Sequence, residues 1–415
     1  MSTLPKCGFC NRPRNEVKAL YGSDPGPYIC NRCVESTQKA AASASKEAAA
    51  SAKDAPLPTP VEINDFLNGH VIGQSKAKVT LAVAVYNHYK RREAARRGFV
   101  MPDGVDPLKS NILVLGPSGT GKTELARALA KMLNVPFHIG DATKMTAAGY
   151  VGDDVESLLQ GLLLQANGDV DRAEWGIILI DEIDKIARKS GKTPSGYKDV
   201  GGESVQQALL KLVEGSEMVI SRQMGVPSGV GGPQQVINTK NILVIAAGSF
   251  AGIEEVVSAR VNKSAGIGFG STDRKRLDLA DVYDLITEKD VLEFGMIPEL
   301  VGRLPVLTST KALTEDEMYR ILVEPKNAIV KQMQALYAMD GIDLVFEEAA
   351  LRHLSRQAME SDTGARSLRS LLEATLAPYS FQAPSEGLAA LRITEDAVKG
   401  GQAIKTYRNR ALGVG

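Results

Sequence analysis

Residues 111–123 read NILVLGPSGTGKT, a short apolar run that leads into a glycine-rich segment ending in Lys122 and Thr123. Gly116 and Gly121 permit a tight loop whose backbone N–H groups point inward, toward phosphate oxygens. The lysine can reach the β- and γ-phosphates, and the threonine hydroxyl can ligate Mg²⁺. The pattern predicts an ATP site formed by Gly116, Pro117, Ser118, Gly119, Thr120, Gly121, Lys122 and Thr123.

The segments on either side of this loop support that interpretation. Residues 112–115 are typical of a buried parallel strand, and residues 123–133 have helical periodicity. The loop would therefore lie at a helix N-terminus, which favours anions. The alternative is a glycine-rich surface turn, which does not explain a Lys-Thr pair at the start of a helix.

A second signal lies at residues 177–182, which read IILIDE. A buried strand here would deliver Asp181 and Glu182 to the edge of the sheet where ligands of open α/β folds bind. Asp181 can orient the Mg²⁺ shell, and Glu182 can polarise an attacking water. Two carboxylates that cap the next helix are the simpler alternative. The pair, taken with the loop, indicates ATP hydrolysis rather than binding alone.

The cysteines form two pairs of Cys-x2-Cys spacing near the N-terminus: Cys7, Cys10, Cys30 and Cys33. Zn²⁺ prefers four tetrahedral sulfur ligands, and each pair supplies two of them from one turn. A module of this size cannot bury enough apolar surface to fold alone, so the metal would supply folding energy. The alternative, two disulfides, is disfavoured in a reducing cytosol. We favour protein binding or dimerisation of the module over nucleic-acid binding.

The composition narrows the class of protein. The chain has 49 basic and 49 acidic residues, which argues against a protein held mainly by nucleic-acid phosphates. No apolar run reaches the length of a membrane span, and the N-terminus lacks a signal-peptide pattern. We expect a soluble cytoplasmic protein with no nucleic-acid or membrane partner.

Apolar segments that alternate with helical patterns predict an α/β fold, with a parallel sheet covered by helices and a smaller, mostly helical domain after it. The predicted strands cover 112–115, 135–139, 176–181, 241–247 and 304–308. The predicted domains are a zinc-binding module over 1–38, a flexible linker over 39–60, a large ATPase domain over 61–310 and a helical small domain over 311–415. The basic run at 86–97 is predicted to be a solvated helix face.

From Cys7 to about Leu372, the order of these motifs resembles that of the ClpX family of AAA+ ATPases. HVIGQ at 70–74 is similar to the segment that contacts adenine, which implies that role for Val71 and Ile72. IPELVGRLP at 297–305 and GARSLR at 364–369 resemble the arginine-finger and sensor-2 segments. The resemblance implies that Arg303 contacts the nucleotide of a neighbouring subunit and that Arg366 reports nucleotide state from the small domain.

Three further segments resemble the parts of ClpX proteins that handle substrates and partners. GYVG at 149–152 is similar to the pore motif, KDV at 198–200 to the second pore loop, and GIGFG at 266–270 to the loop that docks a ClpP peptidase. The residues implied to line the pore are Tyr150, Val151, Lys198, Asp199 and Val200. Those implied to dock the peptidase are Ile267, Gly268 and Phe269.

The resemblance implies an ATP-dependent protein unfoldase and translocase that works as a homo-hexamer with a ClpP-type peptidase. ATP, Mg²⁺ and Zn²⁺ are the implied cofactors, and the zinc module would bind protein substrates or adaptors. Two other functions remain open. One is a remodelling chaperone of the same fold that acts without a peptidase, and the other is a nucleic-acid motor with the zinc module as its reader.

The chain departs from the family pattern at three places. Residues 221–235 carry one cation, Arg222, where ClpX proteins usually have an Arg-Lys-His loop at the pore entrance. We therefore expect an altered preference for C-terminal tags. Ser249 is a candidate sensor-1 group at the end of a predicted strand, and residues 373–415 diverge from the family.

Overall fold

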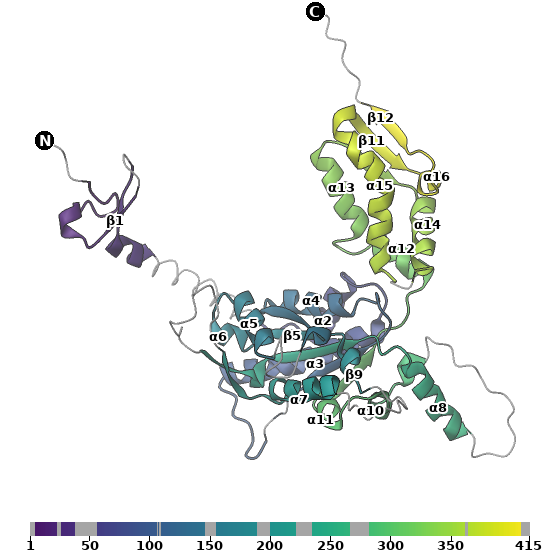
Figure 1. The fold of residues 1–415 in the computed structure, drawn as a ribbon, viewed down its shortest axis with the longest axis horizontal. Coiled ribbons are helices and arrows are strands. Elements are labelled where there is room, and N and C mark those ends of the chain that lie inside the picture. Colours follow the sequence, from purple (N-terminus) through teal and green to yellow (C-terminus); the bar gives the residue numbers. More distant parts are fainter. Residues whose placement is uncertain are drawn as a thin grey trace, which may run out of the picture. The chain divides into compact units, whose positions relative to one another are not determined.

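The fold is that of a computed structural model, which describes residues 5–22, 26–37, 56–105, 107, 109–145, 155–188, 200–220, 235–265, 282–361 and 364–407 (Figure 1). The chain forms two compact units, Met1–Leu57 and Pro58–Gly415. The first unit contains the turn η1 (Arg14–Glu16), the strands β1 (Leu20–Tyr21) and β2 (Ile29–Cys30), and helical residues 31–37. The two strands pair antiparallel, with Leu20 opposite Cys30.

A five-stranded parallel sheet organises the larger part of the second unit. Its order is β4 (Phe137–Asp141), β5 (Ile177–Asp181), β8 (Leu243–Gly248), β3 (Ile112–Leu115) and β9 (Val306–Ser309). All five predicted strands are confirmed, with ends within two residues of those predicted. Because the strands are parallel, the carboxyl ends of β3, β5 and β8 meet at one edge of the sheet.

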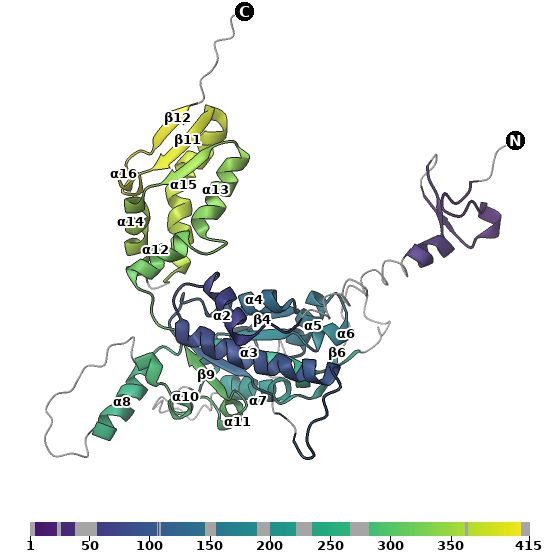
Figure 2. The same ribbon diagram turned by 180° about the vertical axis from the view of Figure 1, so that it is seen from behind.

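Helices cover both faces of this sheet (Figures 1 and 2). The helices that precede β5 in the chain are α2 (Pro60–Asn68), α3 (Ser75–Arg96), α4 (Lys122–Leu133), α5 (Val155–Gln165) and α6 (Val170–Ala173). After β5 the chain forms α7 (Val200–Glu214), α8 (Ile253–Ala265), α10 (Glu288–Phe294) and α11 (Pro298–Gly302), of which α8 extends away from the sheet (Figure 1). The single turns of 3-10 helix are η2 (Ala142–Lys144), η3 (Ile183–Ile186), η4 (Thr239–Asn241) and η5 (Tyr283–Leu285). A separate pair of antiparallel strands consists of β6 (Glu217–Ile220) and β7 (Gln235–Asn238).

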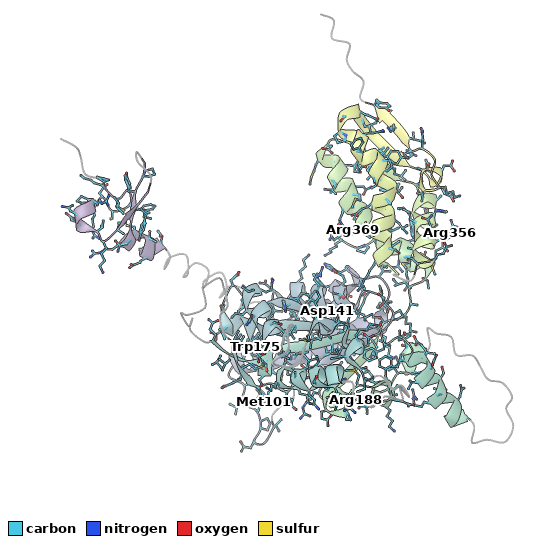
Figure 3. All side chains as sticks on the ribbon, viewed as in Figure 1. Met101, Asp141, Trp175, Arg188, Arg356 and Arg369 are labelled. Carbon is cyan, nitrogen blue, oxygen red and sulfur yellow. The ribbon has the colours of Figure 1, made fainter. Side chains whose placement is uncertain are left out.

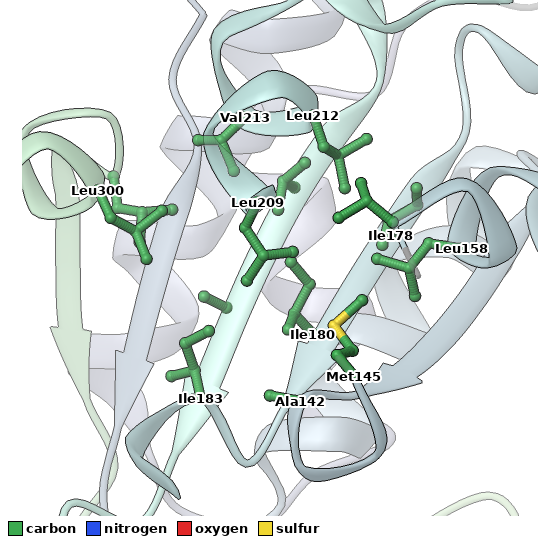
Figure 4. Packing of buried hydrophobic residues seen from close by; sticks show 14 of the residues in the cluster. Ala142, Met145, Leu158, Ile178, Ile180, Ile183, Leu209, Leu212, Val213 and Leu300 are labelled. Carbon is green, nitrogen blue, oxygen red and sulfur yellow. The ribbon is translucent and has the colours of Figure 1, made fainter. Parts of the chain in front are cut away.

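Burial on both faces explains the unbroken apolar runs in the strands. All four residues of β3 are buried, as are the first four of β5 and all six of β8. Figure 4 shows one side of the core, where Ile178 and Ile180 of β5 lie near Leu158 of α5 and Leu209 of α7. In these three central strands only Asp181, at the carboxyl end of β5, is partly exposed.

The predicted mostly helical small domain is confirmed, with one addition. Its helices are α12 (Glu315–Val323), α13 (Ile329–Met339), α14 (Glu348–Met359), α15 (Arg366–Glu386) and α16 (Glu395–Val398). The addition is a sheet of three strands, β10 (Asp343–Phe346), β11 (Leu388–Ile393) and β12 (Ile404–Tyr407). Two of these strands lie in the divergent region after residue 373, where the sequence analysis proposed no strand. No helix among the described residues is long and apolar enough to span a membrane.

The basic run at 86–97 is only partly the solvated face that was predicted. Asn87 and Lys90 are exposed, but the prediction is wrong for His88 and Tyr89, which are buried in α3. The Nε2 of His88 lies 2.9 Å from the Asn241 carbonyl oxygen, and the Tyr89 hydroxyl donates to the Trp175 carbonyl. Burial lowers the pKa of His88 to about 3, so its ring is neutral at physiological pH.

Candidate nucleotide and zinc sites

The glycine-rich loop follows β3 and is held from one side by Thr310. Gly116 has φ +140°, and a Cβ there would lie 2.1 Å from the Thr310 Oγ1, so only glycine fits. The Thr310 backbone N donates to the Leu115 carbonyl at 2.7 Å. The Thr310 hydroxyl also lies 2.6 Å from the Thr120 hydroxyl. Thr310, which sequence reasoning did not identify, therefore fixes the loop at both of its ends.

Lys122 is the first residue of α4 and its ammonium lies inside the loop. Its Nζ donates to the carbonyl oxygens of Gly116 and, at 2.8 Å, Pro117. Burial lowers the pKa of Lys122 to about 8, because a charged group loses its hydration there, although the nearby carboxylates of Asp181 and Asp184 oppose that shift. An anionic ligand beside Lys122 would therefore favour the charged form of its side chain and raise this pKa.

The two nucleotide motifs predicted from the sequence meet through one hydrogen bond. The Thr123 hydroxyl donates to the Asp181 Oδ2 at 2.9 Å, which joins the start of α4 to the carboxyl end of β5. The backbone N of Glu182 donates to the other Asp181 oxygen at 3.0 Å. Glu182 itself has φ +58° and an exposed side chain. A non-glycine residue in this region is uncommon and often occurs at functional sites.

A third carboxylate, Asp184, lies close to these residues and was not identified from the sequence. Its side chain is 4% exposed. It accepts a hydrogen bond from the Ser249 hydroxyl at 2.9 Å and another from the Ser249 backbone N at 3.0 Å. The Ser249 side chain is therefore fixed at the end of β8. The sequence signal available for Asp184 was an acidic residue two positions after the Asp-Glu pair. Its partner, Ser249, could not be found without the order of strands in the sheet.

Lys122 and Thr123 line one cavity of about 780 Å³ together with the three acids and Ser249, and its volume is within the range of small-molecule sites. Arg366 and Arg369, from the first turn of α15, line the same cavity. Figure 3 shows Arg369 on that helix. Gly364 approaches the loop closely, since a Cβ there would lie 2.9 Å from the Ser118 carbonyl oxygen. The described lining consists of Ser118, Gly119, Gly121, Lys122, Thr123, Glu124, Arg127, Asp181, Glu182, Asp184, Lys185, Ser249, Ala365, Arg366 and Arg369.

Val71 and Ile72 are buried, and neither belongs to the described lining of the cavity. The Cγ1 of Val71 lies 3.2 Å from the position that a Cβ on Gly121 would take. Its carbonyl accepts a hydrogen bond from the Nζ of Lys78. The approach of Val71 to Gly121 places the predicted adenine segment against the end of the glycine-rich loop, just before α4.

Arg303 is also absent from the described lining of this cavity. It follows α11 directly, and its side chain is exposed. Its guanidinium lies 3.3 Å from the Glu214 carboxylate at the end of α7. The predicted role of Arg303 at a neighbouring subunit stays a prediction.

The structure describes no side chain of the predicted pore and docking residues. Tyr150, Val151, Lys198 and Asp199 lie outside the described residues, as do Ile267, Gly268 and Phe269. Val200 is the first residue of α7, and its backbone alone is described.

The four cysteines come together in the N-terminal unit as free thiols. Their sulfur atoms all lie within 4.8 Å of one another, with 3.8 Å between Cys7 and Cys33 and 3.6 Å between Cys10 and Cys30. Tetrahedral zinc with Zn–S bonds of about 2.3 Å places its sulfur ligands about 3.8 Å apart. The thiolate set and its spacing therefore fit Zn²⁺, and the backbone N of Cys30 donates to the Cys7 sulfur at 3.3 Å.

Three family comparisons cover most of the chain. Residues 5–41 match the ClpX C4-type zinc finger, and residues 108–307 match the AAA domain of the Cdc48 subfamily. Residues 313–395 match the C-terminal D2-small domain of ClpB protein. These matches follow the N-terminal unit, the large sheet and the small domain in turn.

Full-length relatives carry the name ATP-dependent Clp protease ATP-binding subunit ClpX. The protein of Treponema denticola is 44% identical over 384 residues, which cover 91% of this chain and 90% of that protein. The protein of Bacteroides thetaiotaomicron is 45% identical over 406 residues, with coverages of 96% and 95%. That of Azotobacter vinelandii is 44% identical over 386 residues, with coverages of 92% and 87%. The chain belongs to the ClpX family of AAA+ ATP-binding proteins, with a four-cysteine zinc site at its N-terminus.

Proposed function

We propose that this protein is an ATP-dependent unfoldase and translocase that works as a homo-hexamer and delivers its substrates to a ClpP-type peptidase. The hydrogen bond from Thr123 to Asp181 carries the proposal, because it joins the two nucleotide motifs at one edge of the sheet. The name of the relatives, the ATP-binding subunit of a Clp protease, supports the peptidase partner.

ATP would lie in the cavity above the glycine-rich loop, with its phosphates near Lys122 and the N-terminus of α4. A bound Mg²⁺ would neutralise charge on the phosphates, held through Thr123 and Asp181. Glu182 would accept a proton from the attacking water, and its exposed carboxylate at the cavity wall supports this role. Val71 and Ile72 would contact the adenine.

Two arginines would couple hydrolysis to movement. Arg303, outside its own cavity, would reach the γ-phosphate bound by a neighbouring subunit and stabilise the charge of the transition state. Arg366 lines the cavity from α15, so its contact with nucleotide would bias the hinge between the large and small domains.

The substrate-handling residues complete the proposal. Tyr150 and Val151 would grip the polypeptide in the pore, together with the segment Lys198, Asp199 and Val200. Ile267, Gly268 and Phe269 would dock the peptidase through a hydrophobic contact. The zinc module would bind substrates or adaptors. We retain the domain boundaries predicted from the sequence, with a linker over 39–60.

The experiment that tests this proposal measures ATP-dependent loss of fluorescence from a stably folded reporter with an unstructured C-terminal tail. We expect loss with ATP and a ClpP-type peptidase, and none with Glu182→Gln, which keeps the size of the side chain but removes the base. Full loss of fluorescence with Glu182→Gln would contradict the role of Glu182. Strong stimulation of ATPase activity by DNA, without a response to unfolded protein, would favour a nucleic-acid motor.

The peptidase partnership has its own test. Phe269→Ala should abolish degradation of the reporter by the peptidase and leave ATPase activity unchanged, because the segment at 266–270 is separate in sequence from the predicted nucleotide motifs. Degradation that survives this substitution would favour a remodelling chaperone that acts without a docked peptidase.

A further inference from the structure

Asn111, the residue before β3, joins three segments through one buried amide. Its side-chain nitrogen donates to the carbonyls of Val213 and Arg303, both at 3.0 Å. Its side-chain oxygen accepts from the backbone N of Val244 in β8 at 3.2 Å. Asn111 is 1% exposed, so these bonds are not exchanged with water. The end of α7 and the turn that carries Arg303 are thus fixed to the strand that leads into the phosphate loop.

The same two segments also pack against each other through apolar side chains. Figure 4 shows Leu209, Leu212 and Val213 of α7 directed into the core, with Leu300 of α11 beside them. These residues are buried. Since α11 ends one residue before Arg303, the packing sets the position of the Arg303 backbone relative to the last turn of α7.

The side chains at this junction are much freer than the backbone. Glu214, the last residue of α7, holds its carboxylate 3.3 Å from the Arg303 guanidinium. The Arg303 side chain is 55% exposed and that of Glu214 is 47% exposed. An exposed pair of this kind is weak and is readily broken by a stronger acceptor. The guanidinium can therefore leave Glu214 by rotation of its own side chain, with no movement of the backbone.

We propose that Glu214 is a positioning residue whose carboxylate holds the Arg303 guanidinium away from the neighbouring subunit, in what we call the parked position. The triphosphate bound by the neighbouring subunit competes with Glu214 for this guanidinium. This inference rests on the proposed role of Arg303 as a finger. The triphosphate carries more negative charge than one carboxylate, so it draws the guanidinium away when the interface closes. Glu214 thereby lowers the fraction of time that Arg303 spends at the neighbouring site and restrains ATP hydrolysis when no substrate is present.

The test is the ATPase activity of the full-length protein without protein substrate, for Glu214→Gln and a matched control. Glu217→Gln is that control, because it removes the same charge from another exposed glutamate three positions further along. We expect Glu214→Gln to raise kcat about two- to fivefold, the range that an exposed ion pair supplies. Affinity for ATP and the thermal midpoint should stay at the wild-type values, and Glu217→Gln should leave kcat unchanged.

Arg303→Ala separates this inference from the proposed function. We expect Arg303→Ala to reduce kcat strongly, and Glu214→Gln to have no further effect when it is combined with Arg303→Ala. If Glu214→Gln leaves kcat unchanged or lowers it while Arg303→Ala abolishes hydrolysis, the parked position is wrong and the finger stands. If Arg303→Ala hydrolyses ATP at the wild-type rate, the finger itself is wrong.

Discussion

The hydroxyl groups of Thr120 and Thr310 lie 2.6 Å apart, which connects the phosphate loop to the end of β9. Both residues are buried, and Thr310 also binds the Leu115 carbonyl through its backbone and its hydroxyl. The edge strand of the sheet therefore shapes the loop, although it lies about 190 residues away in the sequence.

Thr310→Val should weaken ATP binding. Valine keeps the shape of threonine but removes the hydroxyl, which leaves the Thr120 hydroxyl with one partner fewer and loosens the loop. The substitution removes both hydrogen bonds of the Thr310 hydroxyl, to Thr120 and to the Leu115 carbonyl. The Leu115 carbonyl keeps the bond from the Thr310 backbone N, so we count a loss of about 1–2 kcal/mol and expect a roughly 5- to 30-fold rise in the Kd for ATP. Binding of a fluorescent ATP analogue to the Glu182→Gln background measures this without hydrolysis. An unchanged Kd would show that the loop holds its shape without Thr310.

Thr308→Val, in β9 two residues before Thr310, should stabilise the fold. Thr308 is buried, and its hydroxyl has no hydrogen-bond partner among the described residues. Valine removes that unsatisfied group at little change in volume, so we expect the free energy of unfolding to rise by about 1 kcal/mol. Thermal unfolding with and without ATP measures the change, and the Kd for ATP should match the wild type. A lower midpoint would mean that the hydroxyl has a partner after all.

ATP binding should depend on pH through Lys122. Its pKa is lowered to about 8 by burial, so the ammonium is present below pH 8 and is lost as the pH rises through that value. A bound triphosphate favours the charged form and raises this pKa again. Affinity should therefore fall above pH 8, and binding at pH 9 should take up a proton. Calorimetry in two buffers of different ionisation enthalpy measures the uptake. No proton uptake in the wild type, matching Lys122→Met, would contradict the assignment.

Removal of zinc should unfold the N-terminal module and leave the ATPase unit folded. Among the described residues of the module, the buried apolar ones are Cys7 and Cys30, so we expect the metal to supply most of its folding free energy. We expect one zinc per chain, lost with a strong chelator or in Cys30→Ser. Proteolysis should then cleave the first unit, while ATP affinity stays at the wild-type value. Retention of zinc in Cys30→Ser would show that three thiolates suffice.

The sequence by itself determined the chemistry and the order of the elements. Two Cys-x2-Cys pairs specify a zinc site because the ligands of each pair lie in one turn, and the glycine-rich loop specifies a phosphate site because its geometry is local. The three central strands of the large sheet, β3, β5 and β8, were predictable because they are buried on both faces and so read as apolar runs. By contrast, β11 and β12 alternate only weakly and were not predicted.

Only the tertiary structure decided which distant residues meet. The partnership of Asp184 with Ser249 and that of Thr310 with Thr120 depend on the order of strands in the sheet, which no local pattern encodes. The burial of His88 within a basic run was likewise set by packing against the turn at Asn241. The junction of Asn111, Glu214 and Arg303 combines three separate segments, so it exists only once the sheet and its covering helices have packed.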